Sequence, residues 1–240
     1  MMKPYIRSIN YYMLVLMSIM SFDVLAANEV NTIDDNGNTS ENFTRVWDFN
    51  ATLDGDPIGN HRFEVIETKY GVTVNTTAQL DVKFLFITVY SYKHNNVEKW
   101  TNDCLVSLNS DTDDNGDISS VELLKEGDKS RITTQNTSVI ESSCVRSFSY
   151  WDRELLKSGA LLNSQTGEII NVDFTYIGSE SLAVNDRMIK SNRYQLLGMD
   201  KDGIEIEIDL WYSDNNRWIG LQSKLENGSF LRYQLDPRFL

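Results

Sequence analysis

The sequence predicts a mainly β protein, an antiparallel curved sheet (half-barrel or barrel) with one short helical segment packed against it. Apolar and polar residues alternate with a period of two over most of the chain from Arg45 onward. Turn-forming runs such as Asp214–Asn216 and Asn227-Gly228 separate the alternating stretches, as in β-hairpins. Only Cys144–Gly167 has a helical pattern, and no alternation of strands and helices favours a doubly wound sheet.

The first residues have the pattern of a secretory signal peptide. Lys3 and Arg7 form a basic start, Tyr11–Phe22 is an apolar run, and Val24–Ala26 fits a small-residue cleavage site. The apolar run has about 12 residues, whereas a membrane-spanning helix needs about 20. The sequence therefore predicts a signal peptide over 1–26, a periplasmic or secreted mature protein, and no membrane span after cleavage. A membrane anchor is the alternative.

The rest of the chain divides into a leader and one domain. Residues 27–44 are polar and rich in Asn, which predicts a flexible leader. No fixed-period repeat and no linker interrupts 45–240, which predicts a single β-rich domain. The formal net charge of −13 argues against nucleic acid or anionic lipid headgroups as partners, and leaves cationic partners open.

The first strands are the longest. Alternation from Val72 to Phe86 predicts a strand that must bend or twist, as in a barrel. From Phe84 to Tyr92 both faces turn apolar, so we expect this stretch to be covered on both sides. Asn95-Asn96 is predicted as a hairpin turn. Further strands are predicted at 45–53, 97–108, 118–124, 131–140, 168–176, 187–198, 204–211, 218–225 and 230–235.

The helical segment is expected to plug the curved sheet. Trp151 and the leucine pairs at 155–156 and 161–162 form one apolar stripe, which predicts a short helix over Trp151–Leu162, interrupted or ended at Gly159. Asn163–Gly167 is a run of turn-forming residues after it.

The chain has two cysteines, Cys104 and Cys144. An even count in a secreted protein predicts a disulfide, and two buried free thiols are the alternative. The bond would close a loop of about 40 residues and stabilise the fold by about 4 kcal/mol in the chain-entropy model.

One acidic stretch has the spacing of a calcium loop. Oxygen-bearing side chains fall at positions 1, 3, 5 and 12, with Gly116 at position 6 and Ile118 at position 8. No helix is predicted before this loop, so a β-hairpin turn is the favoured interpretation and calcium binding the alternative. No other cofactor is predicted. The candidate calcium ligands are Asp111, Asp113, Asn115, Asp117 and Glu122.

No motif selects a catalytic centre. There is no Gly-x-Ser-x-Gly elbow and no phosphate-binding Gly loop. The candidates for a hydrolase or isomerase site are the two histidines with nearby acids, namely His61, His94, Glu98 and Asp152. Solvated hairpin ends are the alternative for these residues.

The aromatic residues either fill a barrel core or line a cavity for an apolar or lipid-like ligand. Alternation alone does not separate these possibilities. The second one makes the protein a non-enzymatic ligand-binding protein, with a cavity between the sheet and the Trp151–Leu162 helix. The candidate ligand-binding residues are Phe84, Phe86, Tyr90, Trp100, Trp151, Asn163, Gln165 and Trp211.

Short motifs spread over nearly all of the predicted mature chain carry a family resemblance. They are Trp47–Phe49, Leu53–Gly55, Ile58–Phe63, Asp81–Thr88, His94, Glu98–Trp100, Cys104-Leu105, Thr112–Gly116, Phe148–Asp152, Leu161–Gly167, Leu210–Ser213, Trp218 and Leu231–Leu235. In these motifs the chain resembles a family of uncharacterised secreted proteobacterial β-proteins known as a domain of unknown function, which implies no particular activity. The ending, a Trp-Tyr strand, a turn and a Leu-Arg-Tyr strand, is also similar to periplasmic half-barrels related to lipoprotein carriers. That likeness implies a sheet wrapped round a helix and binding of acyl chains.

Overall fold

The computed structural model describes residues 30–33, 39–141 and 144–240, so the predicted signal peptide lies outside the described residues. These residues form one sheet of 15 strands and two short 3₁₀ helices. The elements are β1 (Val30–Ile33), β2 (Thr39–Leu53), β3 (Asp56–Thr68), β4 (Gly71–Phe84), β5 (Ile87–Thr101), β6 (Cys104–Asp114), β7 (Asp117–Glu126), β8 (Lys129–Thr134), β9 (Ser138–Glu141), η2 (Arg153–Lys157), β10 (Ala160–Leu162), β11 (Ile169–Val184), β12 (Arg187–Met199), β13 (Glu205–Ser213), β14 (Trp218–Lys224), β15 (Phe230–Leu235) and η3 (Pro237–Phe239).

The sheet consists of two antiparallel meanders, β2–β9 and β10–β15, which are joined where the last strand, β15, pairs with β2. Its order is β10-β11-β12-β13-β14-β15-β2-β3-β4-β5-β6-β7-β8-β9, and β1 pairs with β2 beside this path. All paired strands are antiparallel. The strands at the two ends of this order, β9 and β10, do not pair with each other, so the sheet stays open. The predicted fold class, an antiparallel curved sheet, is therefore confirmed.

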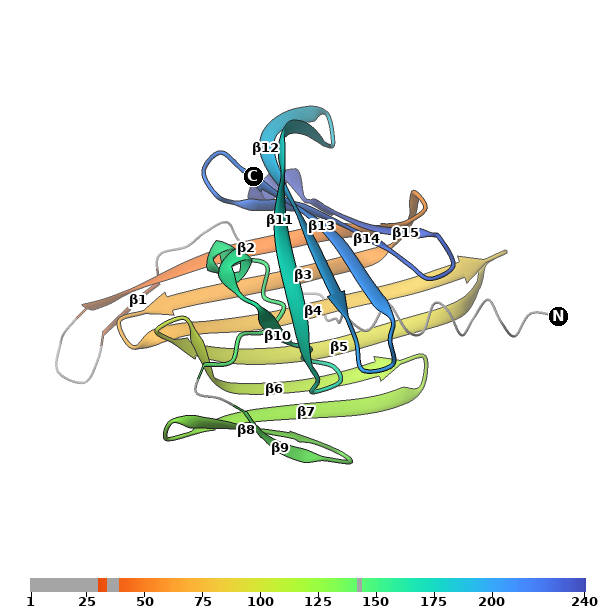
Figure 1. The fold of residues 1–240 in the computed structure, drawn as a ribbon. Coiled ribbons are helices and arrows are strands. Elements are labelled where there is room, and N and C mark those ends of the chain that lie inside the picture. The colour runs from red at the N-terminus through yellow and green to blue at the C-terminus, as the bar shows by residue number, and fades with distance from the viewer. Residues whose placement is uncertain (1–29, 34–38, 142–143) are drawn as a thin grey trace.

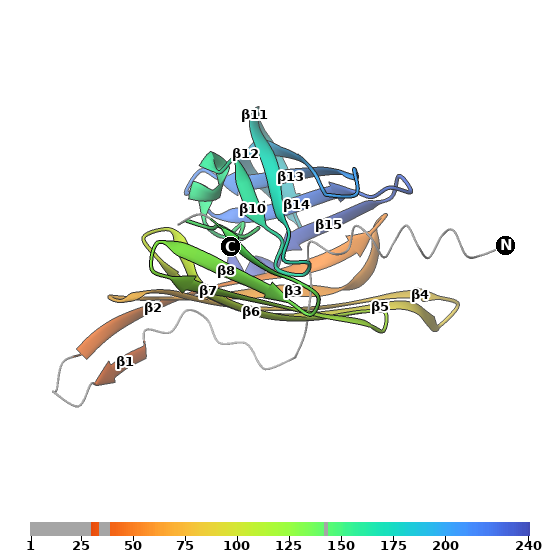
Figure 2. The same ribbon diagram turned by 60° about the horizontal axis from the view of Figure 1, so that its bottom comes forward.

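The two meanders face each other across the core (Figures 1 and 2). β11–β15 lie across the face of β2–β8, and the connection that contains η2 and β10, drawn in green to cyan, lies between them. Large aromatic side chains fill the space. Trp218 is fully buried, and its ring centroid lies 4.2 Å from that of Phe49 and 5.2 Å from those of Phe63 and Tyr150. This part of the interior is therefore packed.

Part of the stretch predicted as a flexible leader is strand. Val30–Ile33 forms β1, and β2 begins at Thr39. The two strands pair in a regular register, with Val30 opposite Asn42 and Ile33 opposite Thr39. Polar, Asn-rich composition hides this pairing because no apolar alternation marks it.

The predicted turn at Asn95-Asn96 is wrong. Both residues lie in the middle of β5, where Asn96 is buried and donates a hydrogen bond to Glu98. The chain turns earlier, at Leu85-Phe86, and later, at Asn102-Asp103, where all four residues have a positive φ. The expectation that Phe84–Tyr92 is covered on both sides is also wrong, because Phe84 is 62% and Phe86 101% exposed.

The predicted helix over Trp151–Leu162 is wrong in type and extent. Only η2 is helical, a five-residue 3₁₀ turn that begins after Asp152, whose side chain accepts a hydrogen bond from the Glu154 amide. The second pair of leucines belongs to β10, where Leu161 pairs with Ile170. The apolar stripe is therefore shared between a turn and a strand.

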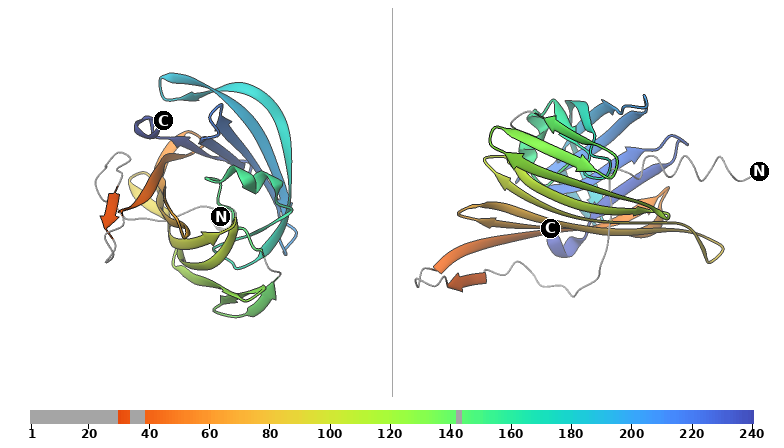
Figure 3. Two further views of the ribbon diagram at one scale, coloured as in Figure 1. Left: turned by 90° about the vertical axis from the view of Figure 1, so that its left-hand side faces the viewer. Right: turned by 90° about the horizontal axis from the view of Figure 1, so that it is seen from below.

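Residues 144–167, hereafter the crossover segment, connect the two edges of the sheet and lie between the meanders (Figure 3). The Leu105 amide donates to the Val145 carbonyl, and the Tyr212 hydroxyl donates to the Tyr150 carbonyl. The segment thus contacts β6 of one meander and β13 of the other, so the predicted plug is present although it is not an α-helix.

Candidate functional site

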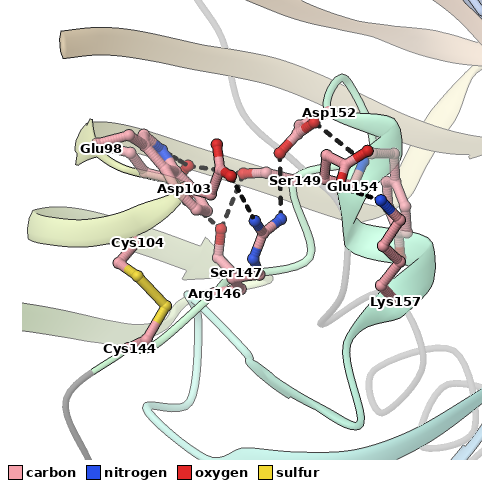
Figure 4. A network of polar contacts seen from close by, with 12 residues as sticks. Glu98, Asp103, Cys104, Cys144, Arg146, Ser147, Ser149, Asp152, Glu154 and Lys157 are labelled. Atoms are coloured by element: carbon pink, nitrogen blue, oxygen red, sulfur yellow. Dashed lines mark hydrogen bonds and ion pairs between the residues drawn. A yellow bond between two sulfur atoms is a disulfide. The ribbon is translucent and has the colours of Figure 1, made fainter.

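A hydrogen-bonded carboxyl group, that of Glu98, anchors the crossover segment to β5 (Figure 4). Glu98 is 1% exposed. Its Oε1 accepts from Asn96 Nδ2 at 2.9 Å and from Ser147 Oγ at 2.7 Å. Its Oε2 accepts from Trp100 Nε1 at 2.9 Å and from Ser149 Oγ at 2.6 Å. A carboxylate has about four acceptor positions, so the protein itself fills those of Glu98.

The local sequence explains this arrangement. Alternate residues of a strand face the same side, so Asn96, Glu98 and Trp100 all point from β5 into the interior. The Ser147-Phe148-Ser149 stretch of the crossover segment has the same spacing, and both serine hydroxyls meet the carboxyl group.

Next to Glu98 is a small polar cavity, hereafter the inner chamber, and two buried histidines, His61 and His94, line it. Burial lowers the pKa of His94 to about 3. Burial, and secondarily the neighbouring His94, lower the pKa of His61 well below its ordinary value. His94 Nδ1 lies 2.8 Å from Thr112 Oγ1, whereas neither ring nitrogen of His61 has a hydrogen-bond partner among the described residues. The chamber is lined by His61, Phe63, Thr76, His94, Asn96, Glu98, Ser147, Phe148, Ser149 and Ser164.

The inner chamber brings together three of the predicted catalytic residues, His61, His94 and Glu98. Its cavity volume of about 20 Å³ has room for about one water molecule. Both imidazoles are uncharged at neutral pH, and the acceptor positions of Glu98 are already filled. The geometry therefore gives Glu98 a positioning role and offers a substrate little access. The fourth candidate, Asp152, does not line this chamber.

Asp152 belongs to a second site, which it lines together with Trp100. Arg146 Nη1 lies 3.1 Å from Asp152 Oδ2, and Arg146 Nη2 lies 3.6 Å from Asp103 Oδ2. Figure 4 shows the guanidinium between the two carboxylates. This clamp joins the β5–β6 turn to the start of η2.

The clamp borders an open cleft of about 210 Å³, hereafter the tryptophan cleft. The Trp100 and Trp151 rings meet edge to face with centroids 5.9 Å apart. Trp100 is buried, Trp151 is half-buried, and Tyr70 on the rim is 79% exposed. Trp151 Nε1 is buried and has no hydrogen-bond partner among the described residues. The cleft is lined by Lys69, Tyr70, Gly71, Val72, Trp100, Thr101, Asn102, Asp103, Trp151 and Asp152.

Several covalent and backbone constraints fix the walls of the tryptophan cleft. The disulfide predicted from the cysteine count is confirmed, with Cα atoms of Cys104 and Cys144 5.0 Å apart. Asn102 and Asp103 adopt left-handed conformations with φ of 51° and 61°, which these residue types tolerate. Gly71 has a φ of 141°, and a Cβ there would lie 2.3 Å from the Trp100 carbonyl oxygen. The cleft is therefore largely preformed.

The predicted ligand-binding residues lie in several places. Trp100 and Trp151 share the tryptophan cleft. Phe84 and Phe86 are at an exposed hairpin tip. The remaining residues are separate: Tyr90 donates to Asp114, Trp211 donates to Glu180, Asn163 accepts from the Gln165 amide, and Gln165 lines a polar groove with Asp114 and Asp117.

The calcium-like stretch forms the β6–β7 hairpin, with its turn at Asn115-Gly116. Asp111 lies opposite Ser120, while Glu122 lies opposite Asn109, so the ladder spreads the candidate ligands Asp111, Asp113, Asn115, Asp117 and Glu122 along the hairpin. Asp113 Oδ1 accepts from the Gly116 amide. In the described part of the chain, no group of three His, Cys, Asp or Glu side chains is placed to hold a metal ion.

Sequence reasoning missed Arg146, Ser147, Ser149 and Tyr70. The spacing of Ser147 and Ser149 was the available signal for a shared hydrogen-bond partner, since two hydroxyls on one side of an extended segment can donate to one acceptor group. Nothing in the sequence indicated which acceptor, because Glu98 is 49 and 51 residues away from them.

Residues 49–236 match the family model described as a domain of unknown function, DUF6134. The chain belongs to this family. Among solved structures, it is similar to the crystal structure of a β-barrel-like protein of a domain of unknown function, DUF1849, from Brucella abortus. The TM-score is 0.58 at 10% sequence identity, over 80% of this chain and 94% of that chain, which shows a common fold. No curated protein matches.

The part of the chain that the structure describes contains no helix long and apolar enough to cross a membrane.

Proposed function

We propose that this DUF6134 protein is a secreted or periplasmic binding protein that holds a ring of a hydroxyl-bearing ligand, such as a sugar unit, in the tryptophan cleft without converting it. The signal-like N-terminus supports the location, as does the disulfide, since such bonds persist in oxidising compartments. The single observation that carries the proposal is that Trp151, whose buried indole N–H has no hydrogen-bond partner among the described residues, lines an open cleft.

The chemistry of the cleft favours an amphipathic ring. The Trp151 and Tyr70 rings offer apolar faces, and aromatic side chains combine such faces with polar edges. Thr101, Asn102 and the two carboxylates of the Arg146 clamp offer partners for hydroxyl groups. Because Arg146 and Lys69 balance Asp103 and Asp152, a neutral ligand fits better than a charged one.

The cleft volume narrows the ligand further. Sites that enclose a whole small molecule have volumes of about 300–1,000 Å³. The tryptophan cleft, at about 210 Å³, is smaller and open. It accommodates one ring, so a larger ligand would leave most of its surface outside. An acyl chain, the ligand class that the half-barrel resemblance implies, fits this short and charged cleft less well.

Isothermal titration with a panel of mono- and disaccharides, including glucose, N-acetylglucosamine, maltose and chitobiose, tests the proposal. We expect millimolar to micromolar binding to at least one probe. Tyr70→Ala should weaken it about 3–10-fold by removing a stacking face. Trp151→Phe, which replaces the indole with a smaller ring and removes the N–H donor, should weaken it by a similar factor.

Tyr176→Ala is the matched control, because Tyr176 is also exposed but lies on β11 of the other meander. It should bind like the parent protein. Absence of binding to every saccharide, together with saturable displacement of a fluorescent fatty acid, would replace the sugar proposal with the lipid one. Equal affinities of the Tyr70→Ala and Tyr176→Ala variants would exclude the tryptophan cleft as the binding site for a sugar or a lipid.

A further inference from the structure

We propose that the β4–β5 hairpin inserts its tip into the interface of a phospholipid bilayer. The relevant part is residues 81–91, hereafter the finger. β4 has no register partner in β3 beyond Leu80, and β5 pairs with β6 only from Tyr92 onward. Between these points the ladder pairs the two strands only with each other, from Asp81 opposite Ser91 to Phe84 opposite Ile87. Ser91, at the base of the finger, also accepts a hydrogen bond from the Asn115 amide of the β6–β7 turn. Figures 1 and 2 show this hairpin extending past its neighbours.

The tip of the finger is apolar and exposed. Phe84, Leu85, Phe86 and Ile87 are consecutive, and their exposed fractions are 62%, 73%, 101% and 67%. An isolated two-stranded hairpin is at best marginally stable in water. An exposed apolar tip adds nothing to that stability, so folding does not explain these four residues.

The turn itself is unfavourable for its residues. Leu85 and Phe86 have φ of 46° and 72°, the left-handed conformation that both central positions of a type I′ turn require. Equivalent turns elsewhere in this sheet use residues that tolerate it, Asp54-Gly55 and Asn115-Gly116. Leucine and phenylalanine therefore occupy positions where Asn-Gly would be more stable. Such strain is typical of a segment with a role outside the fold.

The charges around the tip distinguish it from the rest of the chain. The sequence has 35 acidic residues in 240, yet none between Val82 and Val97. Lys83 lies immediately before the apolar tip, and its long side chain can reach lipid phosphates while its methylene groups follow the apolar residues. The net charge of −13 works against a strongly anionic surface, so a zwitterionic bilayer is the better partner.

The shape also favours a bilayer over a protein partner. The tip is convex and two strands wide, so a protein would need a deep apolar pocket of matching form, whereas fluid lipid adapts to it. Two residues beyond Lys83 extend the chain by about 7 Å. That length matches the roughly 5–10 Å to which interfacial segments are buried.

Attachment at the finger would leave the tryptophan cleft accessible. Gly71 and Val72, at the first end of β4, line the cleft, and the finger is at the other end of the same strand. The 14 residues of β4 span about 45 Å at about 3.3 Å per residue. The cleft would therefore face the aqueous side. The proposal does not depend on what the cleft binds.

Co-flotation of the purified protein with phosphatidylcholine vesicles, and with vesicles that also contain phosphatidylglycerol, tests the proposal. The main variant is Leu85→Asn with Phe86→Gly, which replaces the strained turn with the pair found at Asn115-Gly116. It should melt at the same temperature as the parent protein or higher, and its partitioning into phosphatidylcholine vesicles should fall at least 10-fold. Ile118→Asn, which removes an exposed apolar residue from β7, should partition like the parent.

Three results would overturn the proposal. The first is that the parent protein does not float with phosphatidylcholine vesicles. The second is that the Leu85→Asn, Phe86→Gly variant floats equally well. The third is that the parent is a dimer in size-exclusion chromatography without lipid and that this variant makes it a monomer, which would assign the tip to a second copy of the chain.

Discussion

Ser149→Ala removes one hydrogen bond between the crossover segment and the buried Glu98. Ser149 Oγ lies 2.6 Å from Glu98 Oε2 and 2.8 Å from Ser147 Oγ, and all three residues are buried. A hydrogen bond to a charged group contributes about 1.5–3 kcal/mol. We therefore expect Ser149→Ala to lower the free energy of unfolding by about 2 kcal/mol. At about 2–4 °C per kcal/mol for a domain of this size, Tm should fall by about 4–8 °C.

Urea denaturation followed by tryptophan fluorescence measures the change. Ser147→Ala, which removes the hydrogen bond to Glu98 Oε1, should have a similar effect. The double variant should differ from the sum of the single ones, because both hydroxyls address one carboxyl group. Ser138→Ala is the control, since Ser138 is exposed on β9. Equal stability of the Ser149→Ala and Ser138→Ala variants would refute the anchoring role of Glu98.

Three further predictions concern the segments around this anchor. Replacing both Cys104 and Cys144 with Ser should lower the free energy of unfolding by about 4 kcal/mol; a loss below about 1 kcal/mol, measured by calorimetry, would contradict it. His94 has its pKa lowered from 6.5 to about 3, so the unfolded chain binds a proton that the folded protein does not as pH falls from 6.5 towards 3. Between pH 7 and pH 5 this proton uptake should lower the free energy of unfolding by about 2 kcal/mol. Denaturation curves at the two pH values should therefore show a smaller loss of stability for His94→Asn than for the parent protein. An equal loss for both proteins would refute the prediction. Gly167→Ala should destabilise the protein by at least about 1 kcal/mol, because φ is +74° and the added Cβ would lie 2.5 Å from Thr134 Cγ2; a Tm equal to that of Gly159→Ala, where no atom lies within 4 Å, would contradict it.

The strands were predictable because their signal is local. Alternation of apolar and polar residues reflects one buried face, and β4 shows that pattern, with every second residue buried from Val74 to Leu80. The disulfide was predictable for a different reason, since two cysteines allow only one intramolecular pairing. The join between β15 and β2 was not predictable, because no local pattern indicates which distant strand completes a sheet.

The wrong predictions have specific physical causes. Asn95-Asn96 has turn-forming composition, but Asn96 is in a strand because it pairs with Thr76 of β4 and Ser110 of β6. The leucine pairs of the crossover segment imitate a helix, whereas Leu161 and Leu162 are buried by pairing with β11. In both places pairing with neighbouring strands outweighs the local preference.

The candidate sites were only partly predictable for the same reason. Histidines, acids and tryptophans are recognisable residue types, and Trp100 with Trp151 indeed share a cleft. The predicted catalytic residues lie in two separate sites because of the path that the crossover segment takes past Trp100. His61, His94 and Glu98 line the inner chamber, whereas Asp152 lines the tryptophan cleft. That path is determined by Arg146, Ser147 and Ser149, whose partners are far away in the sequence.

The proposed binding at the tryptophan cleft is tested most directly by the indole N–H resonances of the protein in ¹⁵N NMR. The chain has five tryptophans, and Trp151→Phe assigns the resonance of Trp151 by its loss. On titration with the saccharide that binds best, the Trp151 resonance should move, because a saccharide in the tryptophan cleft lies against the indole that lines it. The Trp218 resonance should stay, because Trp218 Nε1 already donates to the Gly220 carbonyl at 2.9 Å in the core. A Trp151 resonance that stays in place while the saccharide saturates the protein would contradict the proposed function.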